Sequence, residues 1–222
     1  MPLIEQRDPY DRDYTVKVLA DACVEVIGCL LPENDSLLAL DPCVGGGAYA
    51  YAIVDAMHCD VVAFDIDEGA PGLHPHGKYK ACVVPVSGDF LQCFRDECYD
   101  FIASNPPFQL AEEFVVHGLK FAPIVGYLLL ASFIETDGRK QFWDEYPARE
   151  VHFLRQRPAF LRIKDGELNV SSATDQRMYA FFIWERGYTG PTTMHFLDWG
   201  KPDIAALRAE AFELRGQGRL FT

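Results

Sequence analysis

Basic side chains are scarce in this sequence. Among 222 residues, 20 are lysine or arginine and 33 are aspartate or glutamate, which gives a formal net charge of −13. Lysine and arginine supply nonspecific affinity for nucleic acid, because they displace counterions from the phosphate backbone. The composition therefore argues against nonspecific nucleic-acid binding by the whole surface. A nucleic-acid partner would need a local basic patch.

Membrane segments, a secretory signal and paired cysteine motifs are also missing. The longest apolar run, residues 124–134, has roughly half the length needed to span a bilayer, and no basic region followed by an apolar stretch opens the chain. The seven cysteines are odd in number and include no Cys-x-x-Cys pair. We expect reduced thiols in a cytoplasmic protein without membrane contact or metal. A zinc site from Cys93, Cys98, His74 and His76 is the alternative.

Helix-like and strand-like apolar patterns alternate along the chain. With 49% hydrophobic residues, the sequence can bury a core as one elaborated domain over residues 1–222. The alternation predicts an α/β fold whose sheet has about seven mostly parallel strands, with helices on both faces. We expect the last strand to be antiparallel. The strands are predicted at residues 37–40, 61–64, 81–86, 99–103, 124–131, 150–154 and 179–184, and helices at 16–30, 48–57, 111–119 and 203–214.

Polar or glycine-rich residues directly follow four of these strands, at 41–47, Asp65 with Asp67, Asp89, and 105–108. Ligands of an open parallel sheet bind outside the carboxyl ends of its strands. Each signal alone fits an ordinary turn or helix cap. Four signals at consecutive strand ends favour a shared binding site.

The residue types at these strand ends suit an adenosine ligand. Gly45 and Gly47 allow the backbone to approach a ligand closely, and the following helix start offers amide donors. Asp65 can accept from ribose hydroxyls, and Asp89 from an adenine amine. A dinucleotide site is the alternative, but residues 45–50 lack the third glycine of that fingerprint.

The segment Asn105-Pro106-Pro107-Phe108 is the most specific signal. Its prolines fix the backbone beyond a strand and remove two amide donors, so the segment presents acceptors. The Asn105 side-chain oxygen and the Pro106 carbonyl can receive both hydrogens of a planar amine, while Phe108 offers a stacking face. Holding these hydrogens favours a pyramidal nitrogen, whose lone pair can attack an electrophilic methyl group. A rigid turn with a capping asparagine is the alternative.

Four motifs occur in a fixed order: Asp-Pro-Cys-Val-Gly-Gly-Gly at 41–47, Phe-Asp-Ile-Asp at 64–67, Ser-Gly-Asp-Phe at 87–90 and Asn-Pro-Pro-Phe at 105–108. In these motifs the chain resembles the class I S-adenosylmethionine-dependent methyltransferases. More narrowly, it resembles their amino-methylating branch, including small phage-type DNA adenine methyltransferases. The resemblance covers roughly residues 13–190 and implies a Rossmann-like methyltransferase fold.

The resemblance also implies the site and its chemistry. The expected reaction transfers a methyl group from S-adenosylmethionine to the exocyclic amine of adenine, in the cytoplasm of a bacterial or phage-infected cell. The expected catalytic residues are Asn105, Pro106, Pro107 and Phe108. The expected cofactor-binding residues are Tyr14, Thr15, Asp41, Pro42, Gly45, Gly47, Asp65, Asp89, Phe90 and Asn105.

The chain divides into expected functional segments. Residues 1–36 are expected to cover the cofactor, and residues 37–190 to form the catalytic core. Residues 155–178 would be a substrate-recognition insertion, and residues 191–222 a carboxyl-terminal extension.

A local basic patch lies in the expected insertion. Arg155, Arg157, Arg162 and Lys164 surround Phe160, with no acidic residue between them. These cations can contact phosphates, and Phe160 can stack on a flipped base. Together with the resemblance to DNA adenine methyltransferases, this patch makes DNA the favoured partner. A solvated loop anchored by a packed Phe160 is the alternative.

Two other readings of the whole chain are alternatives to this one. The same chemistry could act on RNA adenine or cytosine, or on a protein glutamine. The chain could also be an inactive cofactor-binding subunit of a heteromeric complex, whose acidic surface docks a basic protein. A protein partner or a homo-oligomer is compatible with each.

Overall fold

The structure is a computed structural model. It describes residues 13–33, 36–94, 98–135, 138–158, 160–164, 167–170 and 177–200, together with residues 205 and 209.

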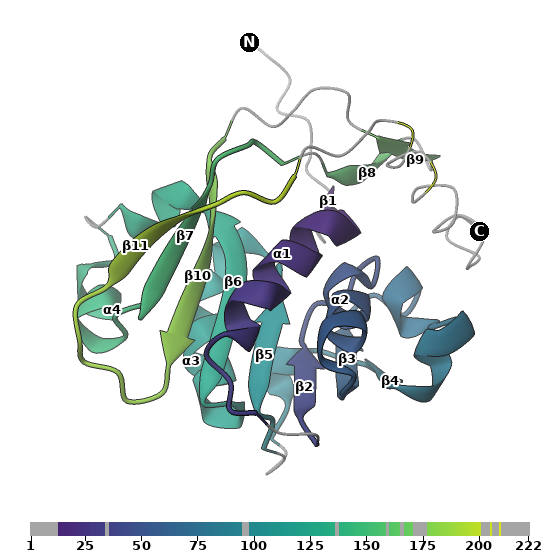
Figure 1. The fold of residues 1–222 in the computed structure, drawn as a ribbon, viewed down its shortest axis with the longest axis horizontal. Helices are drawn as coiled ribbons and strands as arrows, with labels where there is room; N and C mark the ends of the chain where they lie inside the picture. The colour runs from purple at the N-terminus through teal and green to yellow at the C-terminus, as the bar shows by residue number, and fades with distance from the viewer. Residues whose placement is uncertain are drawn as a thin grey trace.

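The centre of the molecule is an eight-stranded sheet with the order β11-β7-β10-β6-β5-β2-β3-β4 (Figure 1). Only β10 runs antiparallel to its neighbours, and the other pairings are parallel. This confirms the mostly parallel sheet and the antiparallel strand near residue 180. The strands are β2 (Leu38–Asp41), β3 (Asp60–Asp65), β4 (Val83–Ser87), β5 (Phe101–Ser104), β6 (Ile124–Leu130), β7 (Glu150–Leu154), β10 (Tyr179–Glu185) and β11 (Thr193–Leu197).

Helices cover both faces of this sheet, as expected. One apolar core lies beneath α1 (Lys17–Gly28) and α2 (Ala48–Met57), and a second beneath α3 (Ala111–Phe121) and α4 (Lys140–Glu145). Short 3₁₀ helices connect the larger elements: η1 (Pro71–Leu73), η2 (Gly77–Ala81), η3 (Phe90–Gln92), η4 (Phe108–Leu110) and η5 (Ala131–Ile134).

The apolar strands serve both cores because successive side chains of a strand point to opposite faces. In β10, Phe181 and Ile183 join the core under α1 and α2, whereas Phe182 and Trp184 join the other core. All four side chains are buried. A near-continuous hydrophobic run is the sequence pattern of strands covered on both faces.

A second, three-stranded sheet has the order β1-β8-β9. It consists of β1 (Asp13–Tyr14), β8 (Leu161–Lys164) and β9 (Glu167–Val170). The sequence predicts no strand within residues 155–178, whereas the structure has β8 and β9 there. Each strand has only four residues. Strand β8 is completed by pairing with β1, about 150 residues away in the sequence, a contact that local patterns do not reveal.

Strand β11 was also missing from the sequence-based prediction. It lies beyond residue 190 and pairs in parallel with β7 at one edge of the main sheet. Met194 and Phe196 are exposed there, so the strand lacks the buried alternation that identified the others. The helix predicted at residues 203–214 lies outside the described residues, except for Ala205 and Ala209, which are helical.

The helices of the described part of the chain are all too short or too polar to cross a bilayer.

Gly126 of β6 lets α1 pack directly on the sheet. A Cβ atom at this position would lie 2.4 Å from Ile27 Cδ1 and 2.5 Å from Phe181 Cζ. We expect Gly126→Ala to lower the free energy of unfolding by about 1–3 kcal/mol, because it overpacks this contact. Urea unfolding measures the change. Gly138→Ala is the control, since its Cβ would meet nothing within 4 Å. Equal effects of the two substitutions would contradict this view of the α1–β6 contact.

Candidate active site

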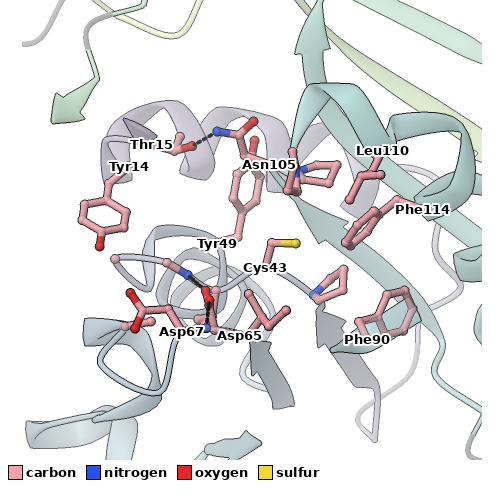
Figure 2. A pocket seen from close by; sticks show the side chains of 18 of the residues that line it. Tyr14, Thr15, Cys43, Tyr49, Asp65, Asp67, Phe90, Asn105, Leu110 and Phe114 are labelled. Carbon is pink, nitrogen blue, oxygen red and sulfur yellow. Dashed lines mark hydrogen bonds between the residues drawn. The ribbon is translucent and has the colours of Figure 1, made fainter. Parts of the chain in front are cut away.

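A pocket opens at the carboxyl ends of β2, β3 and β5, where the sequence placed the ligand site (Figure 2). The structure brings most of the expected cofactor and catalytic residues together around it. The expected residues that line the pocket are Tyr14, Thr15, Pro42, Gly45, Asp65, Asp89, Phe90, Asn105, Pro106, Pro107 and Phe108.

The glycine loop between β2 and α2 needs its glycines for two reasons. Gly45 and Gly47 have φ values of 46° and 90°, in the left-handed region that favours glycine. Space is also restricted, because a Cβ atom on Gly45 would lie 3.0 Å from Tyr14 Cδ1, and one on Gly47 would lie 2.8 Å from the Tyr51 ring. The loop backbone can therefore face the pocket closely at Gly45, while Gly47 begins α2 from outside the lining.

Asp41 supports this loop from behind the pocket. Its side chain is fully buried, and its Oδ1 accepts hydrogen bonds from Ser104 Oγ at 2.6 Å and from the Cys43 amide at 3.3 Å. Burial raises the pKa of Asp41 to about 7, although both hydrogen bonds oppose the shift. Asp41 does not itself line the pocket, so its place is that of a positioning residue.

Asp65 at the end of β3 holds two backbone segments with one carboxylate. Its Oδ2 accepts from the Gly45 amide at 2.8 Å, and its Oδ1 from the Asp67 amide at 2.9 Å (Figure 2). Burial raises the pKa of Asp65, and these two amides oppose the rise. Asp67 also lines the pocket. Two carboxylates therefore lie beside the pocket at this end of the sheet.

Asp89 and Phe90 follow β4 at the next strand end. The exposed Asp89 caps η3, since its Oδ1 accepts from the Leu91 amide at 3.0 Å. Phe90 is buried against Phe64 and Phe114, with ring centroids 6.0 and 5.7 Å apart. These residues give this part of the pocket an apolar wall beside an acidic acceptor.

Asn105 directly follows β5, and its amide is oriented by a single hydrogen bond. Its Nδ2 donates to Thr15 Oγ1 at 3.1 Å, which links the amino-terminal segment to the segment after β5 (Figure 2). Its Oδ1 is buried and accepts no hydrogen bond from the described residues. A buried acceptor without a partner costs free energy. At the wall of a pocket, this atom is available to a ligand donor.

The remaining residues of this segment shape the pocket next to Asn105. Pro106 is buried, and Pro107 and Phe108 are partly exposed. The Phe108 ring lies 5.8 Å from the Tyr179 ring, centroid to centroid. The segment thus presents an amide oxygen, backbone carbonyls and an aromatic side chain. Its two prolines have no N–H group to donate.

The residues of the expected basic patch lie in different surroundings in the structure. Arg155 is exposed but engaged, with its Nε 3.3 Å from Asp198 Oδ2 and its guanidinium over the Phe196 ring. Arg157 is exposed. Arg162 and Lys164 belong to β8, beside β1, but their side chains lie outside the described part of the structure.

Phe160 does not present an open stacking face. It is 2% exposed, and its ring lies 5.1 Å from that of Tyr179. The expectation that Phe160 stacks on a target base is therefore wrong for this conformation, since its ring packs in the core beneath α1 and α2. It anchors the segment that leads into β8.

Several residues that line the pocket have no predicted role in the sequence analysis. Asp67 stands out in the sequence only as a polar residue beside Asp65. The others had no individual signal, because a thiol, apolar side chains and a helical tyrosine occur in any core: Cys43, Tyr49, Leu110 and Phe114. Tyr49 was detectable in principle, since it lies in the first turn of the helix that follows the glycine loop.

The cysteines carry no cross-links, and all seven are free thiols. Within the described ranges, the one cluster of three or more potential metal ligands is Glu150, His152 and His195. The alternative zinc site from Cys93, Cys98, His74 and His76 is not brought together there.

The raised pKa of Asp41 predicts a specific pH dependence of stability. Its pKa rises from about 3.9 when unfolded to about 7 when folded, so the folded state holds the proton more tightly. The Asp41 contribution to stability is full below about pH 4 and is lost as the pH rises to about 7. We expect Asp41→Asn to remove this fall from a series of urea unfolding curves. The exposed Asp60→Asn at the start of β3 is the control. An unchanged pH profile in Asp41→Asn would contradict the assignment.

No protein-family model and no curated protein sequence matches this chain. Solved structures do match. A Listeria monocytogenes protein assigned to the class I S-adenosylmethionine-dependent methyltransferases superposes with a TM-score of 0.63 at 11% identity, covering 94% of this chain and 72% of its own. The methyltransferase subunit of a Streptococcus thermophilus type I restriction-modification system gives 0.62 at 10% identity, covering 93% and 53%. A Pyrococcus horikoshii protein assigned as an RNA methyltransferase gives 0.55 at 14% identity, covering 75% and 83%. At these identities the likeness concerns the fold, and the chain has the Rossmann-like fold of these methyltransferases.

Proposed function

We propose that this chain transfers a methyl group from S-adenosylmethionine to the exocyclic amine of adenine, with DNA as the favoured acceptor. The observation that carries the proposal is the buried Asn105 Oδ1, which has no hydrogen-bond partner among the described residues and belongs to a pocket-lining side chain. The fold supports the class of reaction, and the motif after β5 supports the amine.

The pocket residues fit S-adenosylmethionine chemically. The Gly45 backbone can approach the cofactor closely, and Asp65 and Asp67 can accept from ribose hydroxyls. Asp89 would accept from the adenine amine of the cofactor. Tyr14 and Thr15, on the side of Asn105, would hold the methionine end. When bound, the cofactor supplies an electrophilic methyl group on a positively charged sulfur.

Asn105 would orient the attacking nitrogen. The amine lone pair is delocalised into the base ring, so the planar amine is a weak nucleophile. Acceptance of its two hydrogens by Asn105 Oδ1 and the Pro106 carbonyl favours a pyramidal nitrogen with an available lone pair. The lone pair held in this way would form the bond to the methyl carbon that the cofactor supplies, with the cofactor's sulfur as leaving group and one proton released to solvent. The hydrogen bond from Asn105 Nδ2 to Thr15 Oγ1 holds the amide in the orientation that this requires.

Nucleic acid is the class of acceptor that two structural neighbours favour. One structural neighbour is a restriction-modification methyltransferase subunit, which agrees with DNA, and another is assigned as an RNA methyltransferase. RNA adenine, cytosine and protein glutamine offer a comparable NH₂ group. The net charge of −13 confines any nucleic-acid contact to a local face. The exposed Arg157 and the strand β8, which is joined to the pocket through Tyr14 of β1, define that face.

Replacing Asn105 tests the chemistry directly. We expect Asn105→Ala to reduce kcat for methyl transfer to adenine-containing DNA about 100-fold or more, because an oriented acceptor of the reacting amine is lost. The affinity for S-adenosylmethionine should change by only a few fold. Transfer of a labelled methyl group, with cofactor binding measured by calorimetry, separates the two effects.

Thr15→Val is the matched variant, since it keeps the shape of residue 15 but removes the partner of Asn105 Nδ2. A positioning role predicts a fall in kcat of about 10-fold, with little change in KM for DNA. Unaltered methyl transfer by Asn105→Ala would refute the proposed chemistry. If the wild-type chain binds S-adenosylmethionine but methylates no acceptor, the result favours the inactive-subunit alternative.

Comparing acceptors tests the nucleic-acid assignment. We expect transfer to DNA to exceed transfer to RNA or protein, and to weaken steeply with added salt. Neutralising Arg157, Arg162 and Lys164 to Gln should weaken DNA binding about 10-fold at low salt. It should also reduce the slope of log K against log salt by up to about 3, since each phosphate contact contributes about 0.9. Fluorescence anisotropy measures both quantities.

The control neutralises three lysines elsewhere, Lys78 and Lys80 of η2 and Lys120 at the carboxyl end of α3. It changes the net charge equally. If both triple variants lose the same affinity, only overall charge matters. If neither loses affinity, the acceptor is not held by this face.

A further inference from the structure

A cluster of metal-ligating side chains lies at the edge of the main sheet, away from the pocket. Glu150 and His152 come from β7, and His195 comes from the edge strand β11. The parallel register places His152 directly beside His195 and Glu150 beside Thr193. Because residues two apart on a strand share a face, the three side chains lie on one side of the sheet.

The geometry of this cluster is already close to that of a ligand set. His152 Nε2 lies 2.8 Å from Glu150 Oε2, and the two imidazole rings stack with their centroids 4.7 Å apart. One ligand atom from each residue lies within 4.8 Å of the other two. Tetrahedral zinc with bonds of about 2.0–2.1 Å requires its ligand atoms to be about 3.3 Å apart. Rotation of the exposed His195 side chain can bring its ligand atom to this separation from the other two.

We propose that Glu150, His152 and His195 form a site for a borderline divalent cation, with Zn²⁺ as the preferred ion. Imidazole nitrogens with a carboxylate oxygen are a ligand set that zinc accepts. The exposed side of His195 leaves a fourth position for water. This inference departs from the expectation of a protein without metal, and it is independent of the proposed methyl transfer.

The surroundings of Glu150 and His195 are compatible with such a site. Arg149 Nε lies 3.6 Å from Glu150 Oε1, so the other carboxylate oxygen, Oε2, is the one that faces His152. Among the described residues, His195 Nε2 contacts Thr193 Oγ1 at 3.2 Å, and a metal would replace this contact. The arginine would orient the carboxylate, as partners of metal ligands commonly do.

Binding of a metal here would join β11 to the rest of the sheet. The site spans β7 and β11, whereas the pocket lies at the ends of β2, β3 and β5, on the other side of β10 and β6 in the strand order. A metal at this place therefore acts on structure and takes no part in the reaction. A cation that binds the folded chain and not the unfolded chain raises its stability.

Titration of the chelator-treated full chain, carrying no histidine tag, with ZnCl₂ tests the site. We expect one equivalent to bind by calorimetry and the thermal unfolding midpoint to rise. His195→Ala should weaken zinc binding about 100-fold and abolish the rise in the midpoint. This exposed substitution should leave the metal-free midpoint nearly unchanged. Co²⁺ in place of Zn²⁺ should give visible absorption that is lost in the variant.

His74→Ala is the control, since it removes an exposed histidine outside the cluster and should bind zinc like the wild type. Absence of stoichiometric binding by the wild type, or equal affinity in His195→Ala, would overturn the proposal and leave a stacked histidine pair. Methyl transfer should be the same with and without chelator, so the outcome for this site is separate from that for the pocket.

Discussion

The hydrogen bond from Ser104 to Asp41 is the constraint on which the pocket depends. It joins the ends of two neighbouring parallel strands, β5 and β2, inside the sheet. From β2 the chain passes directly into the glycine loop, and from β5 directly into Asn105 and the two prolines. Asp65 extends the same connection to β3 by accepting from Gly45. The buried Asp41 and the partly buried Asp65 thus fix the relative positions of three strand ends, at the cost of desolvation that raises both pKa values.

The pocket is completed from distant parts of the chain. Tyr14 lies against Gly45, and Thr15 accepts the hydrogen bond of Asn105, so the residues just before α1 close the site that the strand ends open. The same short segment pairs through β1 with β8. A displacement of β8, in the expected substrate-recognition segment, would therefore be transmitted to Asn105 through Tyr14 and Thr15. Under the proposed function, this connection links acceptor binding at β8 to the orientation of the Asn105 amide.

In a chain with a net charge of −13, the structure shows which residues of the expected basic patch already have partners. Of the expected basic patch, Arg155 is engaged by Asp198 and Phe196 of the carboxyl-terminal segment, and Phe160 is packed in the core. Under the proposed function, fewer cations are left to contact a nucleic acid than the sequence predicts: Arg157 is exposed, and Arg162 and Lys164 belong to β8. The strand β11, whose Phe196 contacts Arg155, also supplies His195 to the proposed metal site at the sheet edge.

The sequence by itself determined the α/β class, the order of the main elements and the strand ends that carry the site, because apolar periodicity and glycine or proline turns are local properties. It also identified Asp41, Asp65 and Asn105 from their places after buried strands. Only the tertiary structure decided that Asn105 is oriented by Thr15, that Phe160 is buried, that β1 and β8 pair, and that His152 meets His195. These contacts join residues far apart in the chain, and they depend on strand order and register, which no local pattern encodes.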